Sequence, residues 1–453
     1  MDFGIKAFLS ALLFVSPIFC ADLQEKKVSP IDFRVYDMPT QHSNGVLALI
    51  MSGIQGDEPG AYNATNILLQ YYTIKKGSVR VVPSLSPHSM FFNNRGVFGD
   101  LNRKFATLHS NDPEYSVIQK IKAEILKPDV SAIFHMHDGS GFYREEYVDE
   151  MFGPRRWGNC SIIDQDFINV EPFGNLHDII DKVVQHTNKG LLKPFHKYHI
   201  RNTHTAIKDL AMQKSLTYFA ITNNKPAFAH EASKTLPLRE KTYYHLLGIE
   251  GFLNALGIEF ERHFELNPQN VAKLINDTSI TMSIQSRIQI PIFGLKSPLN
   301  YFPMPLNAKR NLQDIPLDSK SYILGLAHTS NNTLIDIKYG NRTMGRLKPL
   351  YLDFDTSLLS VQMLLDNEER EVAIGSMVRT KESFFIKSKE GYRANVIGFV
   401  KAGDTSNKPQ EFDTLVQKGK MQKRFSIDNA EKMYRVEFYK GEAFAGMIVV
   451  EFE

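Results

Sequence analysis

The hydrophobic pattern of the chain changes near residue 263. Up to that point, short apolar runs alternate with longer segments in which apolar residues recur at helical spacing. Four of the short runs predict buried strands, at 45–51, 79–82, 132–137 and 226–231. Three longer segments predict helices, at 59–72, 112–127 and 238–256. Strands and helices that alternate in this way are typical of an α/β fold, a mixed sheet flanked by helices.

Beyond residue 263 the pattern predicts strands alone. Residues 279–290 alternate apolar and polar side chains, which predicts a half-exposed strand, and similar short runs recur between turn residues to the end of the chain. We therefore expect an α/β domain over 22–262, a small β module over 263–345 and a β-sandwich module, immunoglobulin-like, over 346–453.

The N-terminus has the features of a secretory signal peptide. Lys6 precedes an apolar run over 7–15, and Pro17 breaks this run shortly before the small residue Ala21. Because the run is too short to span a bilayer, we predict a signal peptide over 1–21 and an exported protein, with an uncleaved anchor as the alternative. No other stretch of the sequence is apolar enough to predict a membrane span.

Charge and cysteine content limit the classes of function. A net charge of +3 over 453 residues, without a basic stripe, gives no electrostatic basis for binding nucleic acid. The chain has two cysteines, of which Cys20 lies in the predicted signal peptide. Cys160 alone forms neither an internal disulfide nor a cysteine-rich zinc site. Any metal must therefore have nitrogen and oxygen ligands.

The first candidate motif, Ser52-Gly-Ile-Gln55-Gly-Asp-Glu58-Pro-Gly60, lies where a predicted strand ends and a helix begins. Sites in open α/β sheets commonly occupy this position. Gln55 and Glu58 are three positions apart across a turn, so both side chains can point at one centre. On its own the motif also fits a structural turn, because glycine-rich strand–helix turns are common.

Two further motifs carry chemistry. His135-Met-His137 closes a predicted strand, and strand parity places both histidines on one face, as ligands or as a buried structural pair. Arg95, Asn102 and Arg103 lie in a glycine-rich segment that contains Asp-Leu-Asn-Arg-Lys-Phe. Arginine binds carboxylates bidentately and stabilises oxyanions; a solvated loop is the alternative.

Together these segments resemble the zinc metallocarboxypeptidases of the pancreatic carboxypeptidase type over about residues 42–262. In that family, a His-x-x-Glu turn and a distant histidine bind one zinc ion. An Asn-Arg pair holds the terminal carboxylate of the substrate, a further arginine polarises the scissile carbonyl, and a late glutamate is the general base. The resemblance implies one Zn²⁺ per chain and assigns the following residues: Gln55, Glu58 and His137 to the metal, Asn102 and Arg103 to the carboxylate, and Arg95 and Glu231 to catalysis.

Gln55 stands where this family has histidine. In this respect the chain is similar to the peptidoglycan D,L-carboxypeptidases that determine helical bacterial cell shape. That likeness implies a periplasmic enzyme that releases meso-diaminopimelate from muramyl tripeptide, a peptidoglycan stem peptide. It also leaves open a role for the β modules in binding cell-wall scaffold proteins.

Three more residues are candidates for substrate contact. Thr217 falls where related enzymes have the floor of the specificity pocket, and its hydroxyl suits a hydrogen-bonding end group on the substrate. His135 and Trp157 are the others, with a supporting or packing role as the alternative. Two other classes of function stay open, namely a non-catalytic cell-wall binding protein and a zinc amidohydrolase of the aspartoacylase type.

Overall fold

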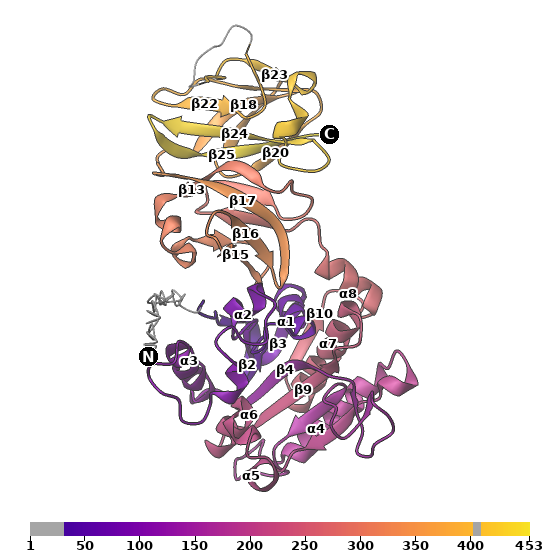
Figure 1. Ribbon diagram of the computed structural model, residues 1–453. Helices are drawn as coiled ribbons and strands as arrows, with labels where there is room; N and C mark the ends of the chain where they lie inside the picture. The colour runs from indigo at the N-terminus through magenta and orange to yellow at the C-terminus, as the bar shows by residue number, and fades with distance from the viewer. Residues whose placement is uncertain (1–30, 402–408) are drawn as a thin grey trace, which may run out of the picture.

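The computed structural model describes residues 31–401 and 409–453, so the predicted signal peptide over 1–21 lies outside the described residues. Figure 1 shows three bodies in a row, with an α/β domain at one end and two β modules following it. This arrangement confirms the predicted fold class. Within the described ranges, every helix is too short or too polar to traverse a lipid bilayer.

The α/β domain is built on a mixed sheet of eight strands, in the order β1-β3-β2-β4-β9-β7-β8, with β10 also paired to β3. Its strands are β1 (Tyr36–Asp37), β2 (Thr40–Met51), β3 (Tyr72–Val82), β4 (Ala132–Gly139), β7 (Cys160–Ile163), β8 (His199–Asn202), β9 (Ala227–Ser233) and β10 (Glu259–Arg262). The central strands β2, β4 and β9 run parallel, and β4 and β9 are buried along their whole length. Strands covered on both faces account for the continuous apolar runs of the sequence.

Helices cover both faces of this sheet (Figure 1). They are α1 (Pro59–Tyr71), α2 (Pro87–Phe91), α3 (Tyr115–Ile125), α4 (Leu176–Lys189), α5 (Thr205–Lys208), α6 (Leu216–Thr222), α7 (Leu238–Ala255) and α8 (Pro268–Ile275). Helix α7 packs against both α1 and α4 and lies directly on the sheet. At Gly248 a Cβ would lie 2.6 Å from Nε2 of His230, so only glycine permits this close packing of α7 on β9. The short strands β5 (Phe142–Tyr143) and β6 (Phe152–Gly153) form a separate pair.

The middle β module contains two sheets around one core. Its strands are β11 (Thr281–Ile284), β12 (Ile288–Pro291), β13 (Leu299–Pro305), β14 (Leu317–Asp318), β15 (Leu324–His328), β16 (Ile335–Tyr339) and β17 (Arg342–Leu352). The single strand predicted over 279–290 is wrong, because β11 and β12 form an antiparallel hairpin. Gln285 and Ser286 make its turn with φ of 51° and 53°. Gln285 continues the alternation of apolar and polar residues, and only Ser286 interrupts it, so one polar residue at an apolar position is the sole trace of the turn in the pattern.

The C-terminal β module is a sandwich of two four-stranded sheets that share one apolar core. Its strands are β18 (Ser360–Leu365), β19 (Glu368–Ala373), β20 (Met377–Thr380), β21 (Ser383–Ile386), β22 (Arg393–Val396), β23 (Leu415–Gln417), β24 (Met433–Lys440) and β25 (Ala443–Phe452). The sheets have the orders β19-β18-β21-β23 and β20-β25-β24-β22.

The core of the middle module reaches into both neighbours. It includes Tyr62 and Phe91 of the α/β domain as well as Phe444 and Met447 of the sandwich. Strand β17 runs through residue 345, where the hydrophobic pattern placed the division between the two β modules. The shared core makes the three bodies one continuous structure.

Candidate active site

Four of the candidate residues lie at the carboxyl ends of three neighbouring parallel strands. The turn that carries Gln55 and Glu58 joins β2 to α1, while His137 and Glu231 lie near the ends of β4 and β9. His137 and Glu231 are register partners, so their side chains leave the same face of the sheet. The parallel strands thereby bring residues from distant parts of the sequence to one edge.

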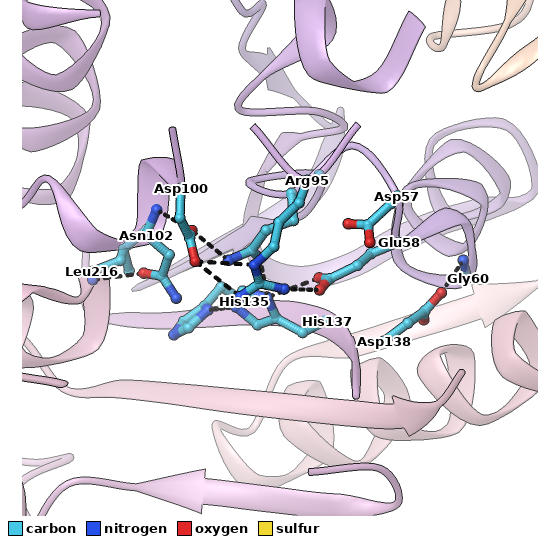
Figure 2. A network of polar contacts seen from close by, with 12 residues as sticks. Asp57, Glu58, Gly60, Arg95, Asp100, Asn102, His135, His137, Asp138 and Leu216 are labelled. Carbon is cyan, nitrogen blue, oxygen red and sulfur yellow. Dashed lines mark hydrogen bonds and ion pairs between the residues drawn. The ribbon is translucent and has the colours of Figure 1, made fainter. Parts of the chain in front are cut away.

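Gln55 and Glu58 both contact His137, and Figure 2 shows Glu58 and His137 side by side. Nδ1 of His137 lies 2.8 Å from Oε1 of Gln55 and 3.0 Å from Oε2 of Glu58, and all three side chains are buried. Burial raises the pKa of Glu58 well above its usual value, and Lys234 opposes this shift. One nitrogen and two oxygens that face each other in a buried site form a donor set suited to a metal ion.

Within the described residues, no three His, Cys, Asp or Glu side chains form a group that could hold a metal. Glu58 and His137 provide two ligands of these types, so the donor set reaches three only with the amide oxygen of Gln55. Three protein ligands and one open position are the usual arrangement of a catalytic zinc site. The residues present therefore fit such a metal, with a neutral amide as the third ligand.

His135 and Thr217 lie behind His137. Nδ1 of His135 is 2.8 Å from Nε2 of His137, and Nε2 of His135 is 2.7 Å from Oγ1 of Thr217. If each ring carries its proton on Nε2, His137 donates to His135, His135 donates to Thr217, and Nδ1 of His137 keeps a lone pair for a metal. Burial lowers the pKa of both histidines, which favours these neutral forms.

Eight of the ten predicted residues line one pocket of about 210 Å³. These eight are Gln55, Glu58, Arg95, Asn102, Arg103, His137, Trp157 and Glu231. His135 and Thr217 are not among the residues that line it, since their polar atoms contact each other beneath His137. A larger cavity of about 350 Å³ lies between the α/β domain and the middle module and contains none of the ten predicted residues.

Arg95 lies between the metal donors and the Asp-Leu-Asn-Arg segment (Figure 2). Its Nε and Nη2 donate to Oδ2 of Asp100 at 3.1 and 2.9 Å, and its Nη1 lies 3.5 Å from Oε1 of Glu58. The side chain is nevertheless half exposed, so it can also contact a molecule in the pocket. A guanidinium held in this way is suited to stabilising negative charge that develops on a carbonyl oxygen.

Asn102 is fixed by the start of α6. Its Oδ1 accepts the backbone N–H of Leu216 at 3.0 Å, which leaves the amide nitrogen for the pocket. Nη1 of the neighbouring Arg103 donates to the carbonyl oxygen of Asn102 at 3.0 Å. The two residues offer N–H donors side by side, as recognition of a carboxylate requires.

Glu231 and Trp157 complete the wall of the pocket. Burial raises the pKa of Glu231 to about 8, with His137 opposing the shift and Glu58 adding to it. A carboxyl group with a pKa near neutrality is suited to accept and return a proton. The indole of Trp157 is held by Arg201, whose guanidinium carbon lies 3.6 Å from the ring centroid.

Sequence reasoning missed Asp138, which is 1% exposed. Its Oδ2 accepts the backbone N–H of Gly60 at 2.9 Å and lies 3.0 Å from Nζ of Lys241, while its Oδ1 is 2.9 Å from Nε2 of His245. Asp138 therefore joins the end of β4 to the start of α1 (Figure 2), and its contact with His245 joins it to α7. The available signal was an aspartate next to His137, together with a lysine and a histidine four positions apart on one predicted helix.

A pocket in which arginine and asparagine donors lie next to a metal donor set and a buried glutamate suits a peptide that ends in a carboxylate. This is the property of a metallocarboxypeptidase. Residues 12–276 match the family described as the catalytic domain of the carboxypeptidase controlling helical cell shape, and the chain belongs to this family. Residues 277–353 match its β-barrel domain, and residues 354–453 match the C-terminal domain of metallo-carboxypeptidase.

Solved structures with high similarity include the cell shape determinant protein Csd4 from Helicobacter pylori. Its apo form is 47% identical, with 93% of this chain and 100% of that chain covered and a TM-score of 0.87. A form bound to tripeptide gives the same values. The mDAP-bound form, described as a D,L-carboxypeptidase, is 49% identical over 90% of this chain and 96% of that chain, with a TM-score of 0.86. A comparison with curated proteins found no match.

Proposed function

We propose that this protein is a zinc-dependent D,L-carboxypeptidase of the periplasm that releases meso-diaminopimelate from muramyl tripeptide. One observation carries the proposal: Asn102 and Arg103 face the same pocket as the Gln55, Glu58 and His137 donor set and Glu231. The similarity to a protein solved with mDAP and with a tripeptide supports the choice of substrate. The predicted signal peptide over 1–21 is the basis for the periplasmic location.

The residues of the pocket divide the reaction among them. Asn102 and Arg103 hold the terminal carboxylate, so cleavage is limited to the last peptide bond. Arg95 faces the carbonyl oxygen of that bond and stabilises the charge it acquires, an effect worth about 10²–10³ in rate for one such donor. Trp157 forms a wall beside the leaving diaminopimelate residue.

Glu231 is the proton-transfer group. In its ionised form it removes a proton from the attacking water, and its carboxyl group then protonates the departing amine. A zinc ion held by Gln55, Glu58 and His137 would supply Lewis acidity, which makes that water more acidic and the carbonyl more electrophilic. His135 and Thr217 orient His137 by the hydrogen bonds described above rather than by forming the floor of the pocket.

The test is the mass of the product from purified muramyl tripeptide. The wild-type protein with zinc should release diaminopimelate and leave muramyl dipeptide, and chelation should stop the reaction. Glu231→Gln should reduce turnover by about 10²–10⁴-fold while zinc remains bound, because only proton transfer is lost. Near-native turnover of Glu231→Gln would show that another group is the base.

The same assay separates the alternatives. A non-catalytic cell-wall binding protein would retain muropeptides without cleaving them. An aspartoacylase-like amidohydrolase would instead cleave N-acyl amino acids in preference to the tripeptide. We further propose that the two β modules present surfaces to cell-wall scaffold proteins, which pull-down with the intact protein would test.

A further inference from the structure

Lys234 is a cation in the pocket to which the proposed reaction gives no role. It lies three positions after Glu231 and lines the same pocket. Its backbone N–H donates to the carbonyl oxygen of Gly139 at 2.7 Å, so the main chain is fixed where β9 ends. Its side chain is 32% exposed and can therefore meet a bound molecule.

The position of Lys234 places it on the acyl side of the scissile bond. Arg95 and Lys234 both approach Oε1 of Glu58, at 3.5 and 3.8 Å. Arg95 also contacts Asp100, which lies two positions before Asn102, whereas Lys234 also contacts Asp57. Figure 2 shows Asn102 on one side of Arg95, and Asp57 with Glu58 on the other. A substrate with its terminal carboxylate at Asn102 and its carbonyl at Arg95 must extend toward the side of Lys234.

The ammonium group of Lys234 has N–H donors left to bind a ligand on this side of the pocket. Nζ lies 2.6 Å from Oδ2 of Asp57, while Oε1 of Glu58 at 3.8 Å is beyond hydrogen-bond distance. An ammonium group has three N–H donors, and among the described residues Asp57 accepts one of them. Asp57 thus holds the ammonium beside the metal donors and leaves donors directed at the pocket.

The substrate under the proposed function, on which this inference rests, has a group that matches. In a stem peptide the glutamyl residue is joined through its γ-carbonyl, so its α-carboxylate is free. Three carbon atoms separate the two groups, a span of about 5 Å for bonds of about 1.5 Å. We propose that Lys234 binds this free α-carboxylate and thereby makes the enzyme selective for an unmodified γ-glutamyl residue before the scissile bond.

Two peptides test this proposal: L-alanyl-γ-D-glutamyl-diaminopimelate and its counterpart in which the glutamyl α-carboxylate is an amide. For each enzyme variant the ratio of kcat/KM for the acid to that for the amide is measured. This ratio is independent of the fraction of folded, zinc-loaded protein, because both peptides report on the same sample. The wild type should prefer the acid by about 10- to 100-fold, the range for a hydrogen bond between charged groups.

Lys234→Met should bring the ratio to within a few-fold of one, mainly through KM for the acid, and Lys234→Arg should keep part of the preference. Lys182→Met, on the exposed surface of α4, is the matched control and should keep the wild-type ratio. An unchanged ratio in Lys234→Met, or no preference in the wild type, would overturn the role of Lys234. Release of diaminopimelate from neither peptide by the wild type would instead overturn the proposed function.

Discussion

Gln55 donates its amide N–H to Oδ1 of Asp100 across 2.8 Å. This contact determines which atom of the amide, nitrogen or oxygen, faces His137. An ionised carboxylate only accepts hydrogen bonds, so the nitrogen of Gln55 must face Asp100 and its oxygen must face His137. Burial works against the ionisation of Asp100, but Arg95 and Gln55 outweigh it and lower its pKa. Asp100 therefore orients the Gln55 amide so that its oxygen faces the proposed metal site.

Asp100→Asn should weaken zinc binding although Asp100 is not itself a ligand. An asparagine can present its own amide N–H to Gln55, which would allow the Gln55 amide to turn its nitrogen toward the metal. Loss of a partner that orients a ligand typically costs about 10- to 100-fold in metal affinity. Competition with a chelator would measure this, with Asp178→Asn on the exposed side of α4 as the control. Native affinity in Asp100→Asn would remove Asp100 from this role.

Gln55→His should bind zinc more tightly, because imidazole is a better donor than a neutral amide for this cation. Turnover need not rise, since a stronger donor leaves the metal less electrophilic and a shifted ligand length can cost about 10²-fold through misplacement. Chelator resistance measures the affinity and tripeptide cleavage measures the rate. Chelator resistance that is equal to or lower than that of the wild type would indicate that Gln55 is not a ligand.

Sequence patterns predicted the parts of this structure that local chemistry determines. The apolar runs ending near His137 and Glu231 predicted two strands. Because these strands are parallel neighbours in the sheet, both residues lie at the same sheet edge. The hairpin turn at Gln285 and Ser286 was missed because the alternation resumes directly after the single interruption at Ser286, so the whole segment has the pattern of one strand. The motif positions thus followed from local sequence, whereas this turn depends on a backbone conformation that the pattern does not encode.

The contacts that hold the site residues in place could not be predicted from sequence, for a different reason. Asp138 meets Gly60 and His245, which lie 78 positions before it and 107 positions after it. Thr217 meets His135 across 82 positions. A count along the sequence assigned Thr217 to a pocket floor, but only the packing of α6 on the sheet, against β9, determines which side chain its hydroxyl reaches. Contacts of this kind are properties of the tertiary structure.

Acid should destabilise the metal-free protein, in part through His196. Burial lowers the pKa of this histidine from 6.5 to about 4, and Lys193 adds to the effect. The unfolded chain therefore takes up the proton first as pH falls, so the stability that His196 contributes is present above pH 6.5 and is lost progressively toward pH 4. One such group lowers the free energy of unfolding by up to about 1.4 kcal/mol per pH unit.

His196→Phe removes this titration while keeping an aromatic ring against Phe142. It should be about 1 kcal/mol less stable than the wild type at pH 7.5, because the hydrogen bond between His196 and the Tyr244 hydroxyl is lost. The decline between pH 6.5 and pH 5 should be shallower. Urea unfolding with chelator present at each pH would measure both, with His177→Gln on the exposed face of α4 as the control. A slope equal to that of the wild type would assign the acid sensitivity to other groups.

The effects of substituting Asp138 and Lys241 on the free energy of unfolding should be coupled. Burial opposes the ionisation of Asp138, but His245 and Lys241 outweigh it and lower its pKa, which favours the ionised carboxylate in the folded protein. Asp138→Asn leaves the ammonium of Lys241 buried without its counter-charge, which should cost about 3–5 kcal/mol. In Asp138→Asn/Lys241→Met neither charge remains, and the asparagine oxygen can still accept the N–H of Gly60. The double variant should therefore be more stable than Asp138→Asn alone. Urea unfolding of the wild type, Asp138→Asn, Lys241→Met and the double variant, each with chelator present, gives the coupling free energy. If the stability changes of the two single variants add up to that of the double variant to within about 0.5 kcal/mol, the two charges act independently.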